Sequence, residues 1–251
     1  MENAESRIIK WRQKNTNIMK CSKNHTTKST CSSRKSISPV KSLKDLINEY
    51  KKKWHLHEDW GIYRSIPEAV FGDTSYTPGN PPMPDVLPDA QWNVFLGKVK
   101  INPHQRYPMT LSQNQTILRK IAEHLAAHWN RKTFKDFEDL YEYVGSILVK
   151  TAANPSGLVK NPYALIIYDI ALRLAYRYGV WPKKYVYLNG SGPFKAANIL
   201  GFGKFIRKRK ILYLDVIKKY PELGKLDAAE LEDFLCIHRK QIEELKNKGL
   251  L

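Results

Sequence analysis

Apolar residues recur at helical spacing over 133–149, which reads TFKDFEDLYEYVGSILV. Intervals of three and four positions put its aromatic and aliphatic side chains on one face of an α-helix. Thr133 is the expected N-cap, and the Asp136 carboxylate would lie near the positive end of the helix dipole. The segment therefore predicts an amphipathic helix with one face turned toward a core.

Comparable apolar stripes occur over 43–54, 112–129, 161–179, 211–220 and 228–249. Ser42 and Asp227 precede two of these segments and are typical helix N-caps, while Gly179 is a typical C-cap. The segment 211–220 also contains β-prone residues, and we favour a helix there. We predict a mainly α-helical fold, with 161–179 as its central, most buried helix because apolar residues surround much of it.

The chain has 251 residues, 42% of them hydrophobic, which is enough for one sizeable core. Residues 1–41 are instead rich in Lys, Ser, Thr and Asn, a composition typical of disordered segments. We predict a disordered basic arm over 1–41 and a single compact multi-helix domain over 42–251. A stretch of roughly 20 apolar residues would be needed to cross a bilayer, and none is present.

The N-terminal sequence MENAESRIIKW lacks the apolar core of a signal peptide. We therefore expect a cytoplasmic protein, nucleoid-associated in a bacterium or nuclear in a eukaryote. Its 3 cysteines are expected to stay reduced there.

Proline and glycine are concentrated in the segment 66–90. Proline has no amide hydrogen and a fixed φ, so this composition excludes long helices and central strands. We predict a long irregular Pro-rich loop that lies on the core as a structural strap. A functional loop is the alternative interpretation.

The 42 Lys and Arg exceed the 24 Asp and Glu, which leaves a formal net charge of +18. Such an excess goes beyond what solubility requires and favours polyanionic partners. We predict a nucleic-acid partner, with DNA favoured over RNA, and no membrane partner. The basic arm would add affinity by displacing counterions from the phosphates.

A glycine turn and a basic run lie close together within 188–210, as LNGSGPFKAANIL followed by FIRKRK. Glycine allows a backbone to approach an anion, and the amides at a helix start point toward it. We therefore predict phosphate contacts that are largely independent of base sequence. The residues expected to make them are Gly190, Gly192, Lys195, Lys204, Arg207, Lys208, Arg209 and Lys210.

In a helical basic run, Lys204 and Lys208 would share one face, as would Arg207 and Lys210. A solvated face without a ligand is the alternative. Aromatic residues are interleaved with these cations, as in sites that stack bases, although core packing is their default role. They are Tyr185, Tyr187, Phe194, Phe202 and Phe205.

The glycine segment resembles the helix-hairpin-helix motif in the order Leu188, Gly190, Gly192, Pro193, Ala196, Ile199 and Leu200. The resemblance covers some thirteen residues and implies a glycine hairpin whose amides bind a DNA phosphate. Ser191 stands where that family has an apolar residue, and the preceding KKYVYL is β-prone where the family has a helix.

A more distant resemblance is to the helix-hairpin-helix DNA glycosylases. It implies a base-excision reaction in which Lys195 attacks the sugar and the Asp215 carboxylate stabilises the developing positive charge. Phe194 occupies the position that best matches the family's lysine, so Lys195 fits only with a shift of one residue. This enzyme is the alternative to a binding protein, and a protein-interaction module using the final helix is a second alternative.

Neither a metal nor another cofactor is predicted. Cys21, His25 and Cys31 lack a fourth ligand nearby. His124 and His128 lie four positions apart on a predicted helix, but Glu123 precedes the first histidine instead of following it as in HExxH zinc proteases. Both groups are better interpreted as ordinary polar residues.

Overall fold

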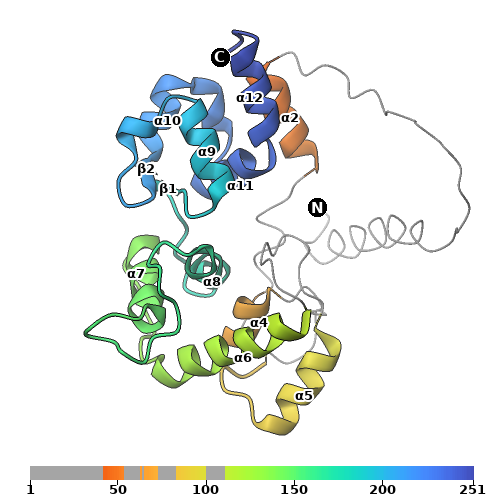
Figure 1. Ribbon diagram of the computed structural model, residues 1–251, viewed down its shortest axis with the longest axis vertical. Coiled ribbons are helices and arrows are strands. Elements are labelled where there is room, and N and C mark those ends of the chain that lie inside the picture. Colours follow the sequence, from red (N-terminus) through yellow and green to blue (C-terminus); the bar gives the residue numbers. More distant parts are fainter. Residues whose placement is uncertain (1–41, 54–62, 64, 73–82, 100–110) are drawn as a thin grey trace, which may run out of the picture. The chain divides into compact units, whose positions relative to one another are not determined.

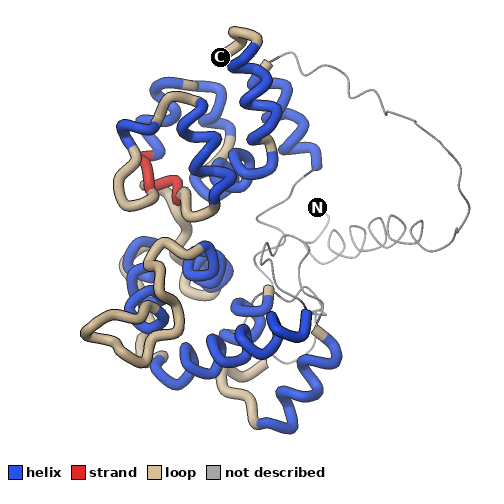
Figure 2. The backbone as a smooth tube through the Cα atoms, in the orientation of Figure 1, coloured by secondary structure: helices blue, strands red, loops and turns tan. Residues whose placement is uncertain are grey.

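The computed structural model of the protein describes residues 42–53, 63, 65–72, 83–99 and 111–251. These ranges contain ten α-helices and a two-stranded sheet (Figures 1 and 2). The prediction of a mainly α-helical fold is therefore confirmed. The predicted disordered arm lies outside these ranges. Among the described helices, none combines the length and the apolar character that crossing a bilayer requires.

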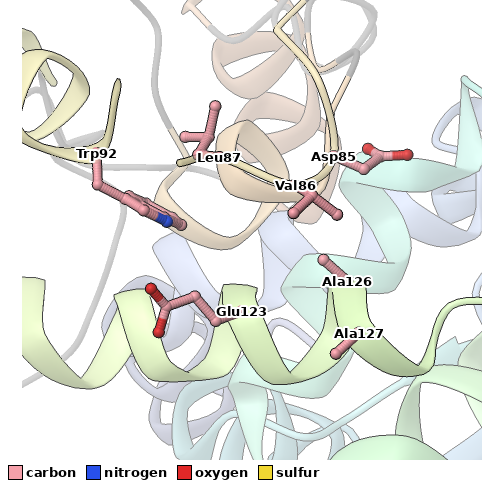
Figure 3. A pocket seen from close by; sticks show the side chains of 7 residues that line it. All are labelled: Asp85, Val86, Leu87, Trp92, Glu123, Ala126 and Ala127. Carbon is pink, nitrogen blue, oxygen red and sulfur yellow. The ribbon is translucent and has the colours of Figure 1, made fainter. Parts of the chain in front are cut away.

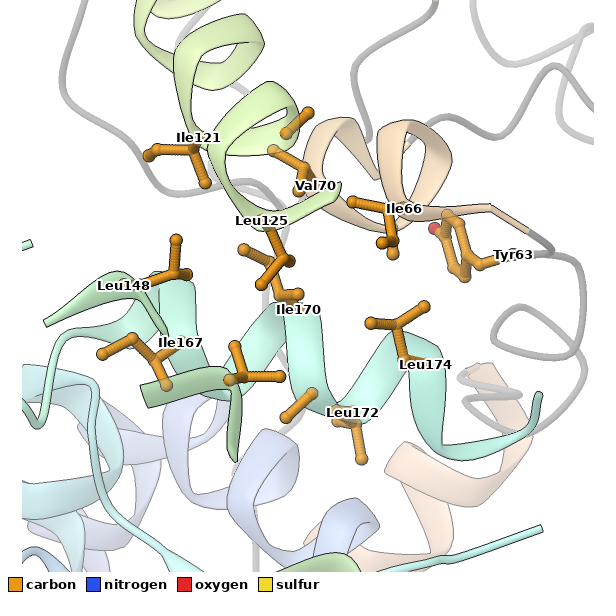
Figure 4. Packing of buried hydrophobic residues seen from close by; sticks show 14 of the residues in the cluster. Tyr63, Ile66, Val70, Ile121, Leu125, Leu148, Ile167, Ile170, Leu172 and Leu174 are labelled. Atoms are coloured by element: carbon orange, nitrogen blue, oxygen red, sulfur yellow. The ribbon is translucent and has the colours of Figure 1, made fainter. Parts of the chain in front are cut away.

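Five helices share one hydrophobic core, which we call the first core region: α4 (Ile66–Phe71), α5 (Asp89–Lys98), α6 (Leu111–His128), α7 (Phe137–Leu148) and α8 (Leu165–Ala175). Figure 4 shows how residues three and four positions apart point into it, namely Ile121 and Leu125 of α6 and Ile167, Ile170 and Leu174 of α8. Helix α8 is buried around most of its circumference, as its composition predicts.

The helix starts in this region differ from the predicted ones. Helix α7 is capped by Asp136, whose carboxylate accepts the Asp139 amide at 2.9 Å, and Thr133 is therefore not the cap. Helix α8 begins at Leu165, beyond the proline of the predicted first turn. Gly179 adopts the left-handed φ of 65° in the turn that follows α8.

Helix α4 corrects the prediction that the Pro-rich segment is irregular from residue 66 onward. Its six residues follow a capping box, in which the Ser65 hydroxyl accepts the Glu68 amide and the Glu68 carboxylate accepts the Ser65 amide. Pro67 lies in the first turn, where a helix does not need the amide hydrogen that proline lacks. Residues 73–82 of the predicted strap lie outside the described residues.

The remaining elements form a second core region: α2 (Leu43–Lys53), β1 (Tyr185–Tyr187), α9 (Ser191–Ile199), β2 (Lys210–Leu212), α10 (Tyr213–Lys219), α11 (Ala228–Ile237) and α12 (Arg239–Asn247), with 3₁₀ turns η2 (Gly203–Phe205) and η3 (Pro221–Lys225). Strands β1 and β2 are antiparallel, with Val186 opposite Ile211. The predicted caps Ser42 and Asp227 are both confirmed, since each accepts amides of the helix that follows.

Two predicted helices of this region differ in the structure. The segment 211–220 begins as strand β2 and becomes helical only at Tyr213, because Ile211 pairs with β1. The predicted C-terminal helix breaks at His238, whose φ and ψ are −95° and 13°. The break redirects the chain, so that Ile242 and Leu245 of α12 are buried in the second core.

Side chains join the two core regions. Tyr187 of β1 stacks on Tyr168 of α8 with ring centroids 5.4 Å apart, and meets Phe137 of α7 edge-on at 5.2 Å. The Trp181 indole N–H donates to the Asp227 carboxylate at 3.2 Å. Aromatic packing and polar contacts therefore hold β1 and the cap of α11 against the first core.

Candidate nucleic-acid interface

The predicted glycine turn is the start of helix α9. Gly190 is the N-cap with extended backbone (φ −73°, ψ 151°), and Gly192 lies within the first helical turn. The preceding element is strand β1 instead of a helix. The amides of Ser191 and Gly192 have no partner within the helix, as at any helix start, and Pro193 has no amide hydrogen to offer.

Close packing accounts for both glycines. A Cβ at Gly192 would lie 2.7 Å from the Cys236 Sγ of α11, and a Cβ at Gly190 would lie 3.1 Å from the Pro193 Cδ. Gly190 is itself buried. Helices α9 and α11 therefore approach each other closely at Gly192, and phosphate contact through either glycine stays a prediction.

The basic run forms a tight β-turn, so the predicted sharing of helical faces does not apply. Arg207 and Lys210 exchange two backbone hydrogen bonds of 2.9 Å, which close the turn. Lys208 and Arg209 at its centre have φ values of 48° and 58°, the left-handed conformation that both central residues of a type I′ turn require. Asn and Gly usually occupy such positions, so two long cations there are unusual.

Arg209 brings the basic turn and the start of α9 together, as predicted from their proximity in the sequence. Its carbonyl accepts the Leu188 amide at 2.7 Å, and its guanidinium lies 3.9 Å from the centre of the Phe194 ring. Leu188 and Phe194 flank the two glycines on either side. The cation–π contact holds the guanidinium beside the first turn of α9.

The other cations of the run differ in what they contact. Lys210 forms an ion pair with Glu138 of α7 and lies 4.5 Å from the Tyr185 ring centre. Burial lowers the pKa of the Lys210 ammonium, and the nearby Asp136 charge opposes this shift. Lys210 is therefore partly buried and paired with a carboxylate, and its contact with a phosphate stays a prediction.

Lys204, Arg207 and Lys208 are exposed and form no ion pair with any described carboxylate. Arg207 Nη1 donates to the Lys204 carbonyl at 2.9 Å and to the Ile206 carbonyl at 3.2 Å. We call Lys204, Arg207, Lys208 and Arg209 the basic tip. The sequence did not reveal Glu138 as a neighbour of the basic run, since it lies 72 positions from Lys210.

The five aromatic residues of the prediction serve different purposes. Tyr187 and Phe202 are buried, Phe194 lies beneath Arg209, and Tyr185 lies beneath Lys210. Phe205, with 44% of its surface exposed, alone presents its ring to solvent as one of the large exposed hydrophobic residues. Core packing is thus the role of most of the set.

Lys195 and Asp215 are the two residues expected to act in the base-excision alternative. Lys195 is exposed on α9, and Asp215 is half-buried in the first turn of α10. No hydrogen bond or ion pair links these two described residues. A catalytic role for the two residues stays a prediction.

A small cavity of about 90 Å³ lies elsewhere, between α6 and the segment leading into α5 (Figure 3). Its lining is mostly apolar, and its two carboxylates are occupied, Asp85 by Arg177 and Glu123 by Arg119. The Trp92 indole nitrogen is buried there without a hydrogen-bond partner. None of the predicted site residues lines this cavity.

The histidine pair on α6 makes ordinary contacts. A His124 ring nitrogen lies 3.2 Å from the Ile147 carbonyl, and His128 Nδ1 lies 2.8 Å from the His124 carbonyl. In the part of the chain that the structure describes, no three His, Cys, Asp or Glu side chains gather around a point that could hold a metal ion. Cys21, His25 and Cys31 lie outside the described residues.

Comparison with known proteins adds no family to this picture, since no family model, curated protein or solved structure matches the chain.

Proposed function

We propose that this protein binds nucleic acid through phosphate contacts made by the basic tip, largely independently of base sequence. The observation that carries the proposal is the tight turn that displays Lys208 at its apex, with Lys204 and Arg207 exposed beside it and no described carboxylate paired with any of them. Like charges repel at this spacing, and polyanion phosphates would offset that repulsion.

The turn supports this function by holding its cations in place. The backbone hydrogen bonds between Arg207 and Lys210, and the stacking of Arg209 on Phe194, limit the conformations of the loop. A preorganised loop loses less entropy on binding than a mobile one. The net charge of +18 would add long-range attraction to the same partner.

The proposal is tested with a triple variant, Lys204→Gln, Arg207→Gln and Lys208→Asn, in which asparagine suits the left-handed backbone at Lys208. Arg209 and Lys210 are kept because Arg209 stacks on Phe194 and Lys210 forms an ion pair with Glu138. Binding to duplex DNA, single-stranded DNA and RNA is measured by fluorescence anisotropy at several salt concentrations. We expect the affinity to fall at least about tenfold, and its dependence on salt to weaken by about one unit of slope for each phosphate that the variant no longer binds.

The matched control removes the same charge from exposed lysines of the first core region, as Lys132→Gln, Lys150→Gln and Lys160→Gln. This control should retain most of the affinity. Equal losses in the two variants would mean that binding depends on net charge alone, and an unchanged affinity in the tip variant would refute the proposal.

No observation favours the two other functions. A base-excision enzyme needs Lys195 and Asp215 in one cleft, and among the described residues no hydrogen bond or ion pair links the two side chains. An interaction module built on the final helix needs an available apolar face, but Ile242 and Leu245 of α12 are packed in the second core. An abasic-site cleavage assay run beside the binding assay would reveal the enzymatic alternative.

A further inference from the structure

Phe205 is an aromatic ring displayed beside the exposed cations of the basic tip. It ends η2 and keeps 44% of its surface exposed, while its neighbour Phe202 is only 2% exposed. The two rings meet edge-on, with centroids 6.5 Å apart and planes at 64°. Phe202 thus supports Phe205 from the core side, and 44% of the Phe205 surface remains open to solvent.

The backbone that carries Phe205 is pinned to helix α9. The Phe205 amide donates to the Phe202 carbonyl at 2.8 Å. A Cβ at Gly203 would lie 2.6 Å from the Asn198 Oδ1, and the Asn198 amide nitrogen donates to the Phe194 carbonyl at 2.8 Å. Because η2 packs this closely on α9, the position of the ring is set by the fold.

Cations lie on both sides of Phe205 along the chain. The Lys204 ammonium is 5.3 Å from the centre of the ring. The Arg207 guanidinium binds the carbonyls of Lys204 and Ile206, the two residues that flank Phe205. One cation therefore lies at the ring and a second is bound to the backbone next to it, where the phosphates of a nucleotide stacked on Phe205 could contact them.

We propose that Phe205 stacks on an unpaired base of a single-stranded nucleic acid, while Lys204 and Arg207 bind the phosphates on either side of that base. The inference rests on the proposed function and specifies its substrate class. In a duplex, both faces of each base are already stacked on neighbouring bases, so an exposed ring gains nothing there. Base–aromatic stacking tolerates any base, which agrees with sequence-independent binding.

The test compares Phe205→Leu with the unchanged protein on three DNA probes of equal length: single-stranded oligothymidylate, the same strand made of abasic sites, and a duplex. Leucine keeps an apolar contact with Phe202 but removes the stacking surface. We expect Phe205→Leu to weaken binding to oligothymidylate about tenfold or more, and to leave binding to the abasic strand and the duplex unchanged. Phe205→Tyr should restore the affinity.

Leu214→Ala is the matched control, because Leu214 is 69% exposed on α10 and its truncation removes an exposed apolar side chain without touching the ring. It should bind all three probes normally. Equal loss of affinity on the three probes, or no loss on oligothymidylate, would overturn the stacking inference. The proposed function would survive that result as long as the triple tip variant still loses affinity for the duplex.

Discussion

The two core regions differ in whether their arginines pair with carboxylates. All four described arginines of the first core region are held by groups of the protein itself, three by carboxylates and one by backbone carbonyls: Arg119, Arg131, Arg177 and Arg173. Among the described residues, no carboxylate pairs with any arginine of the second core region: Arg207, Arg209 and Arg239.

The difference shows that equal charges in the sequence have unequal consequences in the structure. The guanidinium of Arg131 forms two hydrogen bonds with the Asp139 carboxylate, which lowers the pKa of Asp139. Arg207, in contrast, donates to the Lys204 and Ile206 carbonyls and pairs with no carboxylate of the described residues. Arginine thus stabilises the fold in one region and remains available to an anion in the other.

The largest effect expected from this contrast is on Arg173, which is 3% exposed and donates to the Ala69 carbonyl at 2.7 Å. Arg173→Met removes the guanidinium that donates to carbonyls at the end of α4. The Ala69 carbonyl oxygen then loses this buried hydrogen bond. We expect a loss of about 2–4 kcal/mol in the free energy of unfolding, measured by urea denaturation. Arg207→Met should change it by less than about 0.5 kcal/mol. Similar losses in both variants would erase the contrast between the regions.

The second effect concerns glycines of the two regions. Gly192→Ala inserts a methyl group against Cys236 and should lower the free energy of unfolding by about 1–3 kcal/mol. Gly97→Ala in α5 meets nothing within 4 Å and should raise it by roughly 0.5–1 kcal/mol, since alanine favours a helix. Thermal denaturation followed by circular dichroism measures both changes.

Combining Gly192→Ala with Cys236→Ala should recover part of the stability, because the sulfur atom is the nearest atom to the added methyl group. An unchanged free energy of unfolding in Gly192→Ala alone would show that the stability of the protein does not depend on the close approach of α9 and α11.

A third, smaller effect is expected where the first region neutralises a cation of the second. Glu138→Gln would release Lys210 from its ion pair. Because both side chains are partly exposed, at 20% and 28%, the loss of stability should not exceed about 1 kcal/mol. The affinity for DNA should rise at low salt, with a salt dependence steeper by up to about one unit of slope. Unchanged binding in a salt titration would place Lys210 outside the reach of the ligand.

The smallest effect is expected from His238, which is 3% exposed between the rings of Tyr50 and Phe234. Burial lowers its pKa; the Glu49 charge opposes the shift and the Lys53 charge adds to it. The unfolded chain therefore binds a proton more readily than the folded one. The folded protein is therefore more stable, relative to the unfolded chain, while His238 is neutral. This stabilisation is complete above the unfolded histidine pKa, about 6.5, and is lost as the pH falls from there toward the lower pKa of the folded state.

Urea denaturation at several pH values between about 7.5 and 5 measures this dependence near the histidine pKa. The loss of stability at acidic pH should be smaller in His238→Phe, and should persist in the control His124→Gln, which leaves His238 in place. An identical pH profile in His238→Phe would exclude His238 as its source.

The elements that sequence reasoning predicted well are those decided by neighbouring residues. The cap at Asp227 needs only the amides that follow it. The apolar stripe from Phe137 to Leu148 depends only on residues three and four positions apart in the chain. Helix α4 escaped prediction because prolines were taken to disrupt the whole segment. The local capping box of Ser65 and Glu68 was the signal that could have found it.

The candidate site was predicted in its parts but not in its geometry. The proximity of the glycines and the cations follows from the sequence, whereas the conformation of the run does not. Lys210 to Leu212 became a strand because Tyr185 to Tyr187, more distant in the chain, offered a partner with unpaired backbone groups. The turn at Lys208 and Arg209 follows from that pairing, against the usual preference for Asn and Gly.

The sequence by itself determined the helical class, the caps Ser42 and Asp227 and the +18 charge, because these depend on residues close in the chain or on composition alone. Only the tertiary structure decided which charges remain available. Glu138 reaches Lys210 across 72 positions, and α11 covers Gly192 with Cys236. Whether a charge is neutralised or a glycine is enclosed depends on which atoms the fold brings within a few ångströms, and spacing along the chain does not carry that information.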